Sequence, residues 1–523
     1  MLMSGFFKKI LPYTFILLVL VSACARIGRP TGGDKDKTPP RLLKSIPAHK
    51  TTNFNGKELV LYFDEYVQIK EPSKNLLISP PLQQTPVIVP AGIASKTFKI
   101  KFQDSLKPNT TYLTNFGNAI VDYNEGNKLS GFQLVFSTGP VIDSLTLNGK
   151  LQPVYYDDKI ENLIVGLYPA ENFKDSLVFK QKPYYVATAD NKTGTFHLKY
   201  LREGKYRIIG LLDENKDYKY RKGKEAIGFT DKIIEIPGDT LVKLNLFKEP
   251  PRLSFEKIEQ ANKNHLWIEV SGSIDSLQVQ TLDSLPQQIR IIEGNTWHLW
   301  YDTPKDSIKL ALQLGSKTKK YIRKRSKKTD SLQVQIASGN NPLDTLKITA
   351  NIPLIEFDKT KIKLEADSIP LAFDLVLTPK YDYRLVFDKT GGKNYKIVLL
   401  PGALTDFLGN RLKDTLRTNV RIKADKDLGK LIINFKSHTG EKRFVELIKN
   451  KKIYRKTPTT TSDSITIPYL MPGKYKVRIV YDANGNNRWD TGDYLKHRQA
   501  EKTFEPEKEI EIRPNWDINQ TYD

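Results

Sequence analysis

Short apolar clusters interrupted at every second position by polar residues run through the chain from residue 40 onward. Clear examples lie at 98–102, 132–136 and 308–314, where large apolar residues alternate, mostly with lysine or glutamine. A period of two places successive side chains on opposite faces of a β-strand. Long segments with apolar residues three and four positions apart, as in amphipathic helices, are absent. The pattern predicts an all-β protein. Because 523 residues are too many to share a single hydrophobic core, we expect serial β-sandwich domains.

The only cysteine, Cys24, follows an apolar segment near the N-terminus. Lys8 and Lys9 precede apolar residues 15–21, a length typical of a signal-peptide core and too short to span a bilayer. The sequence Val-Ser-Ala-Cys at 21–24 resembles the lipobox of bacterial lipoproteins. The resemblance implies export, cleavage before Cys24 and lipid on its sulfur, whereas a buried free thiol does not account for this position.

Charge and hydropathy restrict the partners. No later apolar stretch approaches the ~20 residues of a membrane helix, so the lipid anchor alone would hold the protein at the membrane. The formal net charge of +23 attracts polyanions, but motifs of nucleic-acid binding are absent, and we expect no nucleic acid. Another envelope protein or a glycan is the expected partner. The densest basic run, 317–328, is interpreted either as a contact with phosphorylated lipid head groups or as a solvated loop.

Two pairs of segments repeat along the chain. Residues 201–220 align without a gap with residues 470–489, at an offset of 269 residues, and both copies contain Gly-Lys-Tyr followed by an acidic loop. Residues 118–122 (Asn-Ala-Ile-Val-Asp) resemble residues 402–406 (Gly-Ala-Leu-Thr-Asp), and Gly-Asn follows each. A two-domain arrangement is therefore predicted to occur twice, with a strand-rich stretch between the copies.

Markers of two known domain types lie in the first copy. Thr-Pro-Pro at 38–40, the segment 59–65 and Phe-Ser-Thr-Gly at 136–139 resemble the bacterial Ig-like domain first described in S-layer proteins. Asp190 and Gly-Thr-Phe at 194–196 make the second unit similar to transthyretin-like modules of carboxypeptidase regulatory domains. The predicted segments are a signal peptide at 1–23, a flexible tether at 24–38, an Ig-like domain at 39–140, a transthyretin-like β-sandwich at 141–249, a β-rich middle domain at 250–340, a second Ig-like domain at 341–425, a second transthyretin-like β-sandwich at 426–515 and a tail at 516–523.

The whole order resembles that of outer-membrane lipoproteins with an Ig-like domain from Bacteroidetes-type bacteria. That resemblance implies a non-catalytic scaffold, spacer or binding protein of the cell envelope. In such bacteria, lipoproteins on the cell surface often carry acidic residues behind the cysteine, whereas residues 25–29 here are basic, so the resemblance favours the periplasmic face. Two alternatives stay open: a calcium-stiffened adhesin or glycan-binding protein, and a carbohydrate-active enzyme.

Motifs of catalysis are missing from the sequence. The six histidines are scattered, and neither the spacing of zinc hydrolases nor a Gly-x-Ser-x-Gly elbow occurs. Carboxylate pairs such as Asp64-Glu65 can serve glycosidases, because the fold alone brings such groups together. The simpler interpretation is that Asp64-Glu65 ends a strand and faces water. We predict that the protein is not an enzyme.

One acidic loop is a candidate calcium site. Its oxygen-bearing residues recur at alternate positions, as in the EF-hand loop. The candidate ligands are Asp482, Asn484, Asn486, the carbonyl of Arg488, Asp490 and Asp493. Asn487 stands where an EF-hand has glycine, and Asp493 is shorter than the usual glutamate, so a hairpin loop held by Asx turns is the alternative.

A third pattern is the triplet of aspartate, serine or threonine, and an aliphatic residue. It is similar to the O-glycosylation motif of Bacteroidetes envelope proteins. The alternative is that aspartate and serine or threonine begin a turn and the aliphatic residue begins the next strand. The twelve triplets begin at Asp104, Asp143, Asp175, Asp239, Asp275, Asp283, Asp306, Asp330, Asp344, Asp367, Asp414 and Asp463.

Overall fold

The computed structural model describes residues 36–155, 160–238, 241–272, 274, 277–314, 317–337, 339–437 and 440–522. Cys24 and the predicted signal peptide lie outside the described residues. Strands dominate the described part, whose one α-helix, α2 (Pro72–Asn75), has four residues. No helix in these ranges is long and apolar enough to cross a membrane. The all-β prediction is confirmed.

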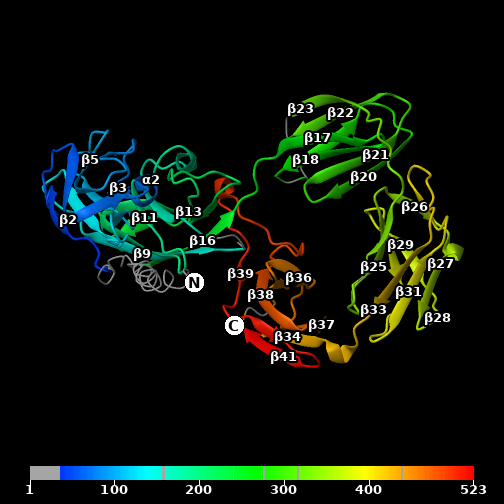
Figure 1. Cartoon of the computed structure of the whole chain (residues 1–523). Helices are drawn as coiled ribbons and strands as arrows, with labels where there is room; N and C mark the ends of the chain where they lie inside the picture. The colour runs from blue at the N-terminus through cyan, green and yellow to red at the C-terminus, as the bar shows by residue number, and fades with distance from the viewer. Residues whose placement is uncertain are drawn as a thin grey trace, which may run out of the picture. The chain divides into compact units, whose positions relative to one another are not determined.

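The chain divides into two compact units, the first ending at Ile142 and the second continuing from Asp143, with Ser79–Pro81 assigned to the second. The first unit pairs its strands in the orders β1-β2-β5-β4, with β7 beside β2, and β3-β6-β8 (Figure 1). Its strands are β1 (Leu42–Ile46), β2 (Glu58–Ile69), β3 (Leu77–Ser79), β4 (Val87–Val89), β5 (Ser95–Lys101), β6 (Thr111–Asn115), β7 (Ile120–Asp122) and β8 (Gln133–Ser137).

The alternation of apolar and polar residues along the strands builds the core of this unit. On β5, Phe98 and Ile100 are buried while Lys99 and Lys101 are exposed, as the period of two predicts. Tyr112 of β6 stacks on Phe136 of β8 with ring centroids 5.4 Å apart, and both rings are buried. Apolar burial of this kind stabilises a sandwich without disulfides.

The carboxylates Asp64 and Glu65 do not end a strand. They lie in the middle of β2 and are half-buried, at an irregularity where the pairing with β5 shifts register. The Asp64 carboxylate accepts hydrogen bonds from the Arg41 backbone amide at 2.8 Å and from Arg41 Nε at 3.1 Å. The expectation of a solvated strand end was therefore wrong, because a bulge allows polar side chains inside a long strand.

Within the second unit, residues 143–249 form one sheet path, β11-β10-β13-β14-β16-β9-β12, with β15 beside β13. The strands β9 and β16 run parallel, and the other pairs are antiparallel. A short 3₁₀ helix, η1 (Asp175–Phe179), precedes β11. The strands are β9 (Leu145–Pro153), β10 (Leu163–Pro169), β11 (Tyr185–Thr188), β12 (Thr195–Leu201), β13 (Gly204–Leu212), β14 (Ala226–Phe229), β15 (Ile234–Ile236) and β16 (Leu241–Lys248).

The next strands form a sandwich of two antiparallel sheets, β17-β18-β21-β20 and β19-β22-β23. The predicted strand at 308–314 is confirmed as β22, and most of the basic run is strand β23 instead of a loop. The strands are β17 (Ser254–Asn262), β18 (His265–Ser271), β19 (Leu277–Thr281), β20 (Gln287–Glu293), β21 (Thr296–Asp302), β22 (Ser307–Leu314) and β23 (Lys317–Lys324).

A further set of strands follows in the orders β24-β25-β30-β29, β28-β27-β31-β33 and β26-β32. A small apolar cluster joins it to the preceding sandwich, with Ile291 and Trp300 on one side and Ile352 and Phe407 on the other. The strands are β24 (Val334–Ala337), β25 (Leu346–Ala350), β26 (Leu354–Phe357), β27 (Ile362–Ala366), β28 (Ile369–Pro370), β29 (Asp374–Leu377), β30 (Tyr383–Val386), β31 (Asn394–Leu399), β32 (Leu404–Asp406) and β33 (Leu416–Arg421).

The last sandwich has the sheets β37-β34-β41 and β36-β35-β38-β39, with β40 also beside β38. Residues 516–523 were predicted to be a tail, but strand β41 pairs in parallel with β34 and packs Ile518 and Tyr522 against the core. Only these two apolar residues mark the strand in the sequence. The strands are β34 (Gly429–Phe435), β35 (Arg443–Lys449), β36 (Lys452–Lys456), β37 (Ser464–Leu470), β38 (Gly473–Tyr481), β39 (Thr503–Phe504), β40 (Ile510–Ile512) and β41 (Asp517–Tyr522).

The predicted repeats correspond to equivalent structures. In both sandwiches a central strand, β13 or β38, leads into the acidic loop, and a parallel strand closes the sheet. The buried carboxylate of Asp122 accepts the backbone amides of Glu125, Gly126 and Asn127, and that of Asp406 accepts those of Leu408 and Asn410. The repeated aspartates thus hold tight turns after short strands.

Candidate functional site

The acidic loop after β38 is organised around Asp482, which is fully buried. Its carboxylate accepts hydrogen bonds from the backbone amides of Gly485, Asn486 and Asn487 at 2.8, 3.1 and 2.8 Å, and from the Thr459 hydroxyl. Burial opposes ionisation of Asp482, but these hydrogen bonds outweigh it and lower the pKa of the carboxyl. Asp482 is therefore a charged group that fixes the backbone of the loop.

The structure brings the next three candidate ligands together. The Asp490 carboxylate accepts hydrogen bonds from the side-chain amides of Asn484 and Asn486, at 2.5 and 2.9 Å. The amide oxygens of Asn484 and Asn486 accept the backbone N–H groups of Asn486 and Arg488, at 3.0 and 2.7 Å. These are Asx turns, so the loop satisfies its own polar groups.

Asp493 has other partners. It caps the 3₁₀ helix η5 (Tyr494–Lys496) by accepting the Lys496 amide, and its carboxylate lies 3.8 Å from Lys222 Nζ. Within the residues that the structure describes, no group of three or more His, Cys, Asp or Glu side chains is placed to hold a metal ion. Calcium binding by the loop stays a prediction.

Glu501 completes the loop and was not predicted from the sequence. Its carboxylate accepts the backbone amides of Ala483 and Asp490, both at 2.9 Å. Burial raises the pKa of this carboxyl. No spacing rule could have identified Glu501, because it lies on the segment that returns beside the loop before β39 (Thr503–Phe504).

The first copy of the loop, after β13, uses its aspartates in the same way. The Asp213 carboxylate accepts the amides of Asp217 and Tyr218, at 3.2 and 2.9 Å. Asp217 forms an ion pair with Arg221 at 2.8 Å. The common role of Asp213 and Asp482 is therefore to hold the loop.

The loop after β38 also contacts the sandwich of residues 143–249. Tyr155 lies between Trp489, with parallel rings at 4.4 Å, and the buried guanidinium of Arg478, 4.2 Å from the ring centroid. Its hydroxyl donates to Glu446 Oε1 at 3.1 Å. Burial and the Glu446 carboxylate raise the pKa of Tyr155 to about 12. We call these four residues the Tyr155 clasp.

Further contacts extend the same interface. Tyr494 is buried, its ring lies 5.2 Å from that of Phe229, and its backbone amide donates to Glu249 Oε1 at 3.0 Å. His497 lies between two carboxylates, 2.5 Å from Asp231 and 3.0 Å from Asp175. Hydrogen bonds to Asp231 and Asp175 raise the pKa of His497. The acidic loop therefore acts as a connector between two sandwiches.

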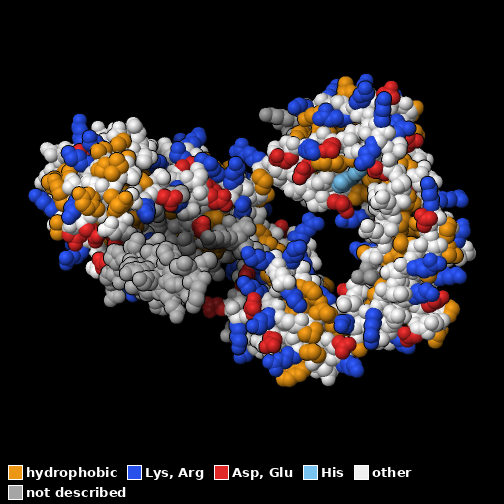
Figure 2. Space-filling view, in the orientation of Figure 1, with side chains coloured by type: hydrophobic (Ala, Val, Ile, Leu, Met, Phe, Trp, Pro, Cys, Tyr) orange, Lys and Arg blue, Asp and Glu red, His pale blue; other side chains and the backbone are white. Residues whose placement is uncertain are grey.

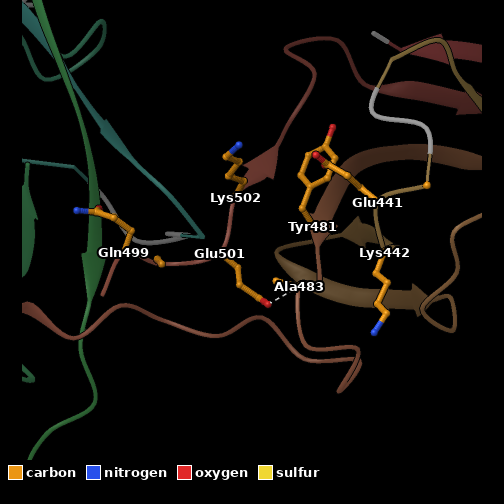
Figure 3. A pocket seen from close by; sticks show the side chains of 9 residues that line it. Glu441, Lys442, Tyr481, Ala483, Gln499, Glu501 and Lys502 are labelled. Atoms are coloured by element: carbon orange, nitrogen blue, oxygen red, sulfur yellow. Dashed lines mark hydrogen bonds between the residues drawn. The ribbon is translucent and has the colours of Figure 1, made fainter. Parts of the chain in front are cut away.

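A pocket of about 600 Å³ lies beside the loop (Figure 3). Figure 3 shows Glu501 directed toward Ala483, to which it is hydrogen-bonded, and away from the open space. The lining mixes two glutamates with two lysines and one tyrosine. The lining residues are Gly440, Glu441, Lys442, Tyr481, Ala483, Gln499, Ala500, Glu501 and Lys502.

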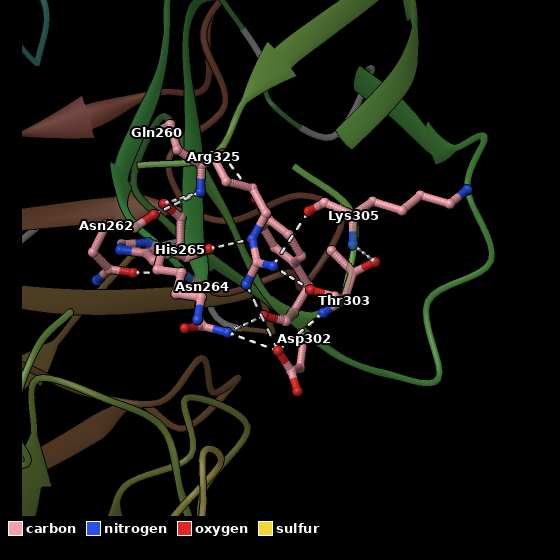
Figure 4. Close-up of polar contacts among 10 residues, drawn as sticks. Gln260, Asn262, Asn264, His265, Asp302, Thr303, Lys305 and Arg325 are labelled. Carbon is pink, nitrogen blue, oxygen red and sulfur yellow. Dashed lines mark hydrogen bonds and ion pairs between the residues drawn. The ribbon is translucent and has the colours of Figure 1, made fainter. Parts of the chain in front are cut away.

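Basic side chains are spread over the visible surface and do not form one field (Figure 2). On β23, Lys319, Lys320 and Lys324 are exposed, while Tyr321 and Arg323 are half-buried. Beyond the strand, Arg325 is held by the backbone oxygens of Lys263, Thr303 and Lys305 (Figure 4). The basic run thus combines a charged edge strand with a structural arginine.

A family model matches the first part of the chain. Residues 36–138 match the family model described as bacterial Ig-like domain. No curated protein matches the sequence.

Several solved structures align with large parts of the chain at low similarity. The S-layer protein SbsC is 10% identical, with 90% of this chain and 67% of that one covered and a TM-score of 0.14. The α2-macroglobulin of Escherichia coli is 12% identical over 54% and 96%, with a TM-score of 0.15. BcpA, the major pilin subunit of Bacillus cereus, is 9% identical over 73% and 99%, with a TM-score of 0.14. The strand pairing shows an all-β protein of several sandwiches, whose residues 36–138 match the bacterial Ig-like domain.

Proposed function

We propose that the protein is a lipid-anchored scaffold or binding protein of the bacterial envelope, without catalytic activity. The observation that carries this proposal is the sequence at 21–24, which combines a signal-peptide core with the chain's only cysteine. The described part of the protein has no helix that could span a membrane. Acyl chains on Cys24 would therefore hold the protein at the outer membrane. The basic residues behind Cys24 favour the periplasmic face.

The contacts inside the second unit support a positioning role. The Tyr155 clasp and the buried Tyr494 connect the sandwich of residues 143–249 with the last sandwich. Ile291, Trp300 and Phe407 connect the two sandwiches between them in the sequence. Buried contacts between sandwiches suit a scaffold that presents binding surfaces.

The histidines that the structure shows in contacts have structural partners, which also supports a non-catalytic protein. His265 stacks on Trp300 at 4.0 Å and lies 2.9 Å from His298. Burial lowers the pKa of His265 to about 4, so it stays neutral near pH 7. His497 serves the interface with residues 143–249.

Fractionation of cells that express the protein tests the proposal. Wild-type protein is expected in detergent-soluble outer membranes, and the Cys24→Ala variant is expected in the soluble fraction. Cys24→Ala protein that stays membrane-bound after a high-salt wash would contradict the lipid anchor. Protease treatment of intact cells then separates the two faces, because only a surface-exposed protein is digested.

A further inference from the structure

Two strand edges without a second partner border one side of the middle sandwich. In the described part of the chain, β17 pairs only with β18, and β23 pairs only with β22. The two edge strands lie side by side in Figure 1, and a groove of about 490 Å³ runs between them. Its lining, which we call the β17–β23 groove, consists of Phe255, Glu256, Lys257, Ile258, Lys319, Tyr321 and Arg323.

The floor of the groove is apolar. Phe255, Ile258 and Tyr321 are partly buried and pack against the core of the sandwich. The rings of Phe255 and Tyr321 meet edge to face at 5.8 Å, across the gap between the two sheets. An apolar side chain of a ligand could therefore continue the core at this place.

Two cations of β23 lie on the same face of the strand as Tyr321, and of these Arg323 is half-buried and Lys319 is exposed. Lys319, Tyr321 and Arg323 are paired with Leu312, Leu310 and Ile308 of β22, which are fully buried. Directly opposed residues of antiparallel strands point to the same face, so the three side chains point toward the core side. Lys319 Nζ and Arg323 Cζ lie 5.3 and 5.5 Å from the Tyr321 ring centroid.

These two cations have no carboxylate partner within ion-pair distance in the described ranges, whereas Lys257 across the groove is paired with Glu259. Inward charges on an edge strand also protect it against aggregation, which accounts for their presence without a ligand. That role needs neither an aromatic floor nor a groove. Unneutralised cations beside an apolar floor fit an acidic ligand.

The spacing selects the kind of ligand. Lys319 and Arg323 are four residues apart on an extended strand, roughly 13 Å at ~3.3 Å per residue. Acidic side chains at positions i and i+4 of another extended chain have the same separation and leave position i+2 over Tyr321. Free strand edges also offer backbone hydrogen bonds to a peptide.

We propose that the β17–β23 groove binds an extended acidic peptide segment of another envelope protein. Carboxylates at i and i+4 pair with Lys319 and Arg323, and an apolar side chain at i+2 packs on Phe255, Ile258 and Tyr321. Glu256 on the opposite strand repels the carboxylates and thereby directs them to β23. This inference rests on the proposed function, because it names the kind of partner that the envelope scaffold binds.

Binding of a fluorescent synthetic peptide with glutamates four positions apart and a valine midway tests the proposal on the purified protein. The double variant Lys319→Glu/Arg323→Glu is expected to weaken binding about tenfold or more. The matched control Lys320→Glu/Lys324→Glu carries the same charge change on the outward face of β23 and is expected to lose less than about threefold. Circular dichroism confirms that both variants are folded.

Equal losses in the two double variants would show unspecific charge attraction and would overturn the proposal. Absence of peptide binding by the wild-type protein would do the same. Binding of anionic vesicles or heparin that depends on Lys319 and Arg323, without peptide binding, would assign the groove to a lipid or a glycan. None of these outcomes affects membrane attachment through Cys24, so failure here differs from failure of the proposed function.

Discussion

Removal of the Tyr155 ring is expected to loosen the contact between the last sandwich and residues 143–249. The ring stacks on Trp489, packs under the Arg478 guanidinium and donates a hydrogen bond to Glu446. An aromatic pair contributes ~0.5–1.5 kcal/mol, a cation–π contact ~0.5–2 kcal/mol and a hydrogen bond to a charged group ~1.5–3 kcal/mol. These terms are not additive, and we expect Tyr155→Ala to cost about 2–4 kcal/mol of interface stability.

Hydrogen exchange of the segment 483–502 measures this effect. A loss of about 2–4 kcal/mol raises its opening equilibrium about 30- to 700-fold, since ~1.4 kcal/mol corresponds to a factor of ten. Tyr155→Phe keeps both ring contacts and is expected to cost about 1–2 kcal/mol. Tyr123→Ala removes a tyrosine that is 59% exposed in the other unit and serves as the matched control, within about 0.5 kcal/mol. Unchanged exchange of 483–502 in Tyr155→Ala would refute the reasoning.

Four further outcomes are expected. Because the pKa of His497 is raised in the folded protein, its charged form stabilises the interface fully below pH ~6.5, the pKa of unfolded histidine, and this stabilisation is lost as pH rises through the folded pKa. Hydrogen exchange of the segment 483–502 should therefore rise with pH in the wild-type protein and lose that dependence in His497→Gln. Asp482→Ala leaves several backbone amides without an acceptor and should destabilise the last sandwich by about 2–4 kcal/mol in urea unfolding, with a Thr459→Val control that costs about 1 kcal/mol. If the loop binds calcium, EDTA should lower the melting temperature of the wild-type last sandwich and leave Asp490→Asn unchanged, and an identical EDTA effect on both would exclude the loop. Deletion of 516–523 removes β41 and should unfold the last sandwich at lower urea concentration, whereas an unchanged midpoint would mean that β41 contributes nothing.

Local patterns predicted most of the fold. Period-two alternation identified strands such as β5 and β22, because burial on one face of a strand is a property of neighbouring residues. The repeat at Asp213 and Asp482 was visible in the sequence because each aspartate accepts backbone amides only a few positions further along its own loop. Strand β41 was missed, since its two apolar residues give little pattern.

The contacts of the candidate sites depend on residues far apart in the sequence. Tyr155 meets Glu446 and Trp489 across more than one intervening sandwich, and a single tyrosine carries no signal for that contact. Glu501 closes the acidic loop from a returning segment. The β17–β23 groove exists only because two separate edge strands lie side by side. Such contacts follow from packing and not from spacing.

Mass spectrometry of the N-terminal peptide from protein purified out of its native membrane tests the central proposal most directly. A peptide that begins at Cys24 and carries the mass of acyl chains on that residue is the predicted result. A peptide with an unmodified Cys24 thiol, or a chain that retains residues 1–23, would contradict the lipid-anchored scaffold.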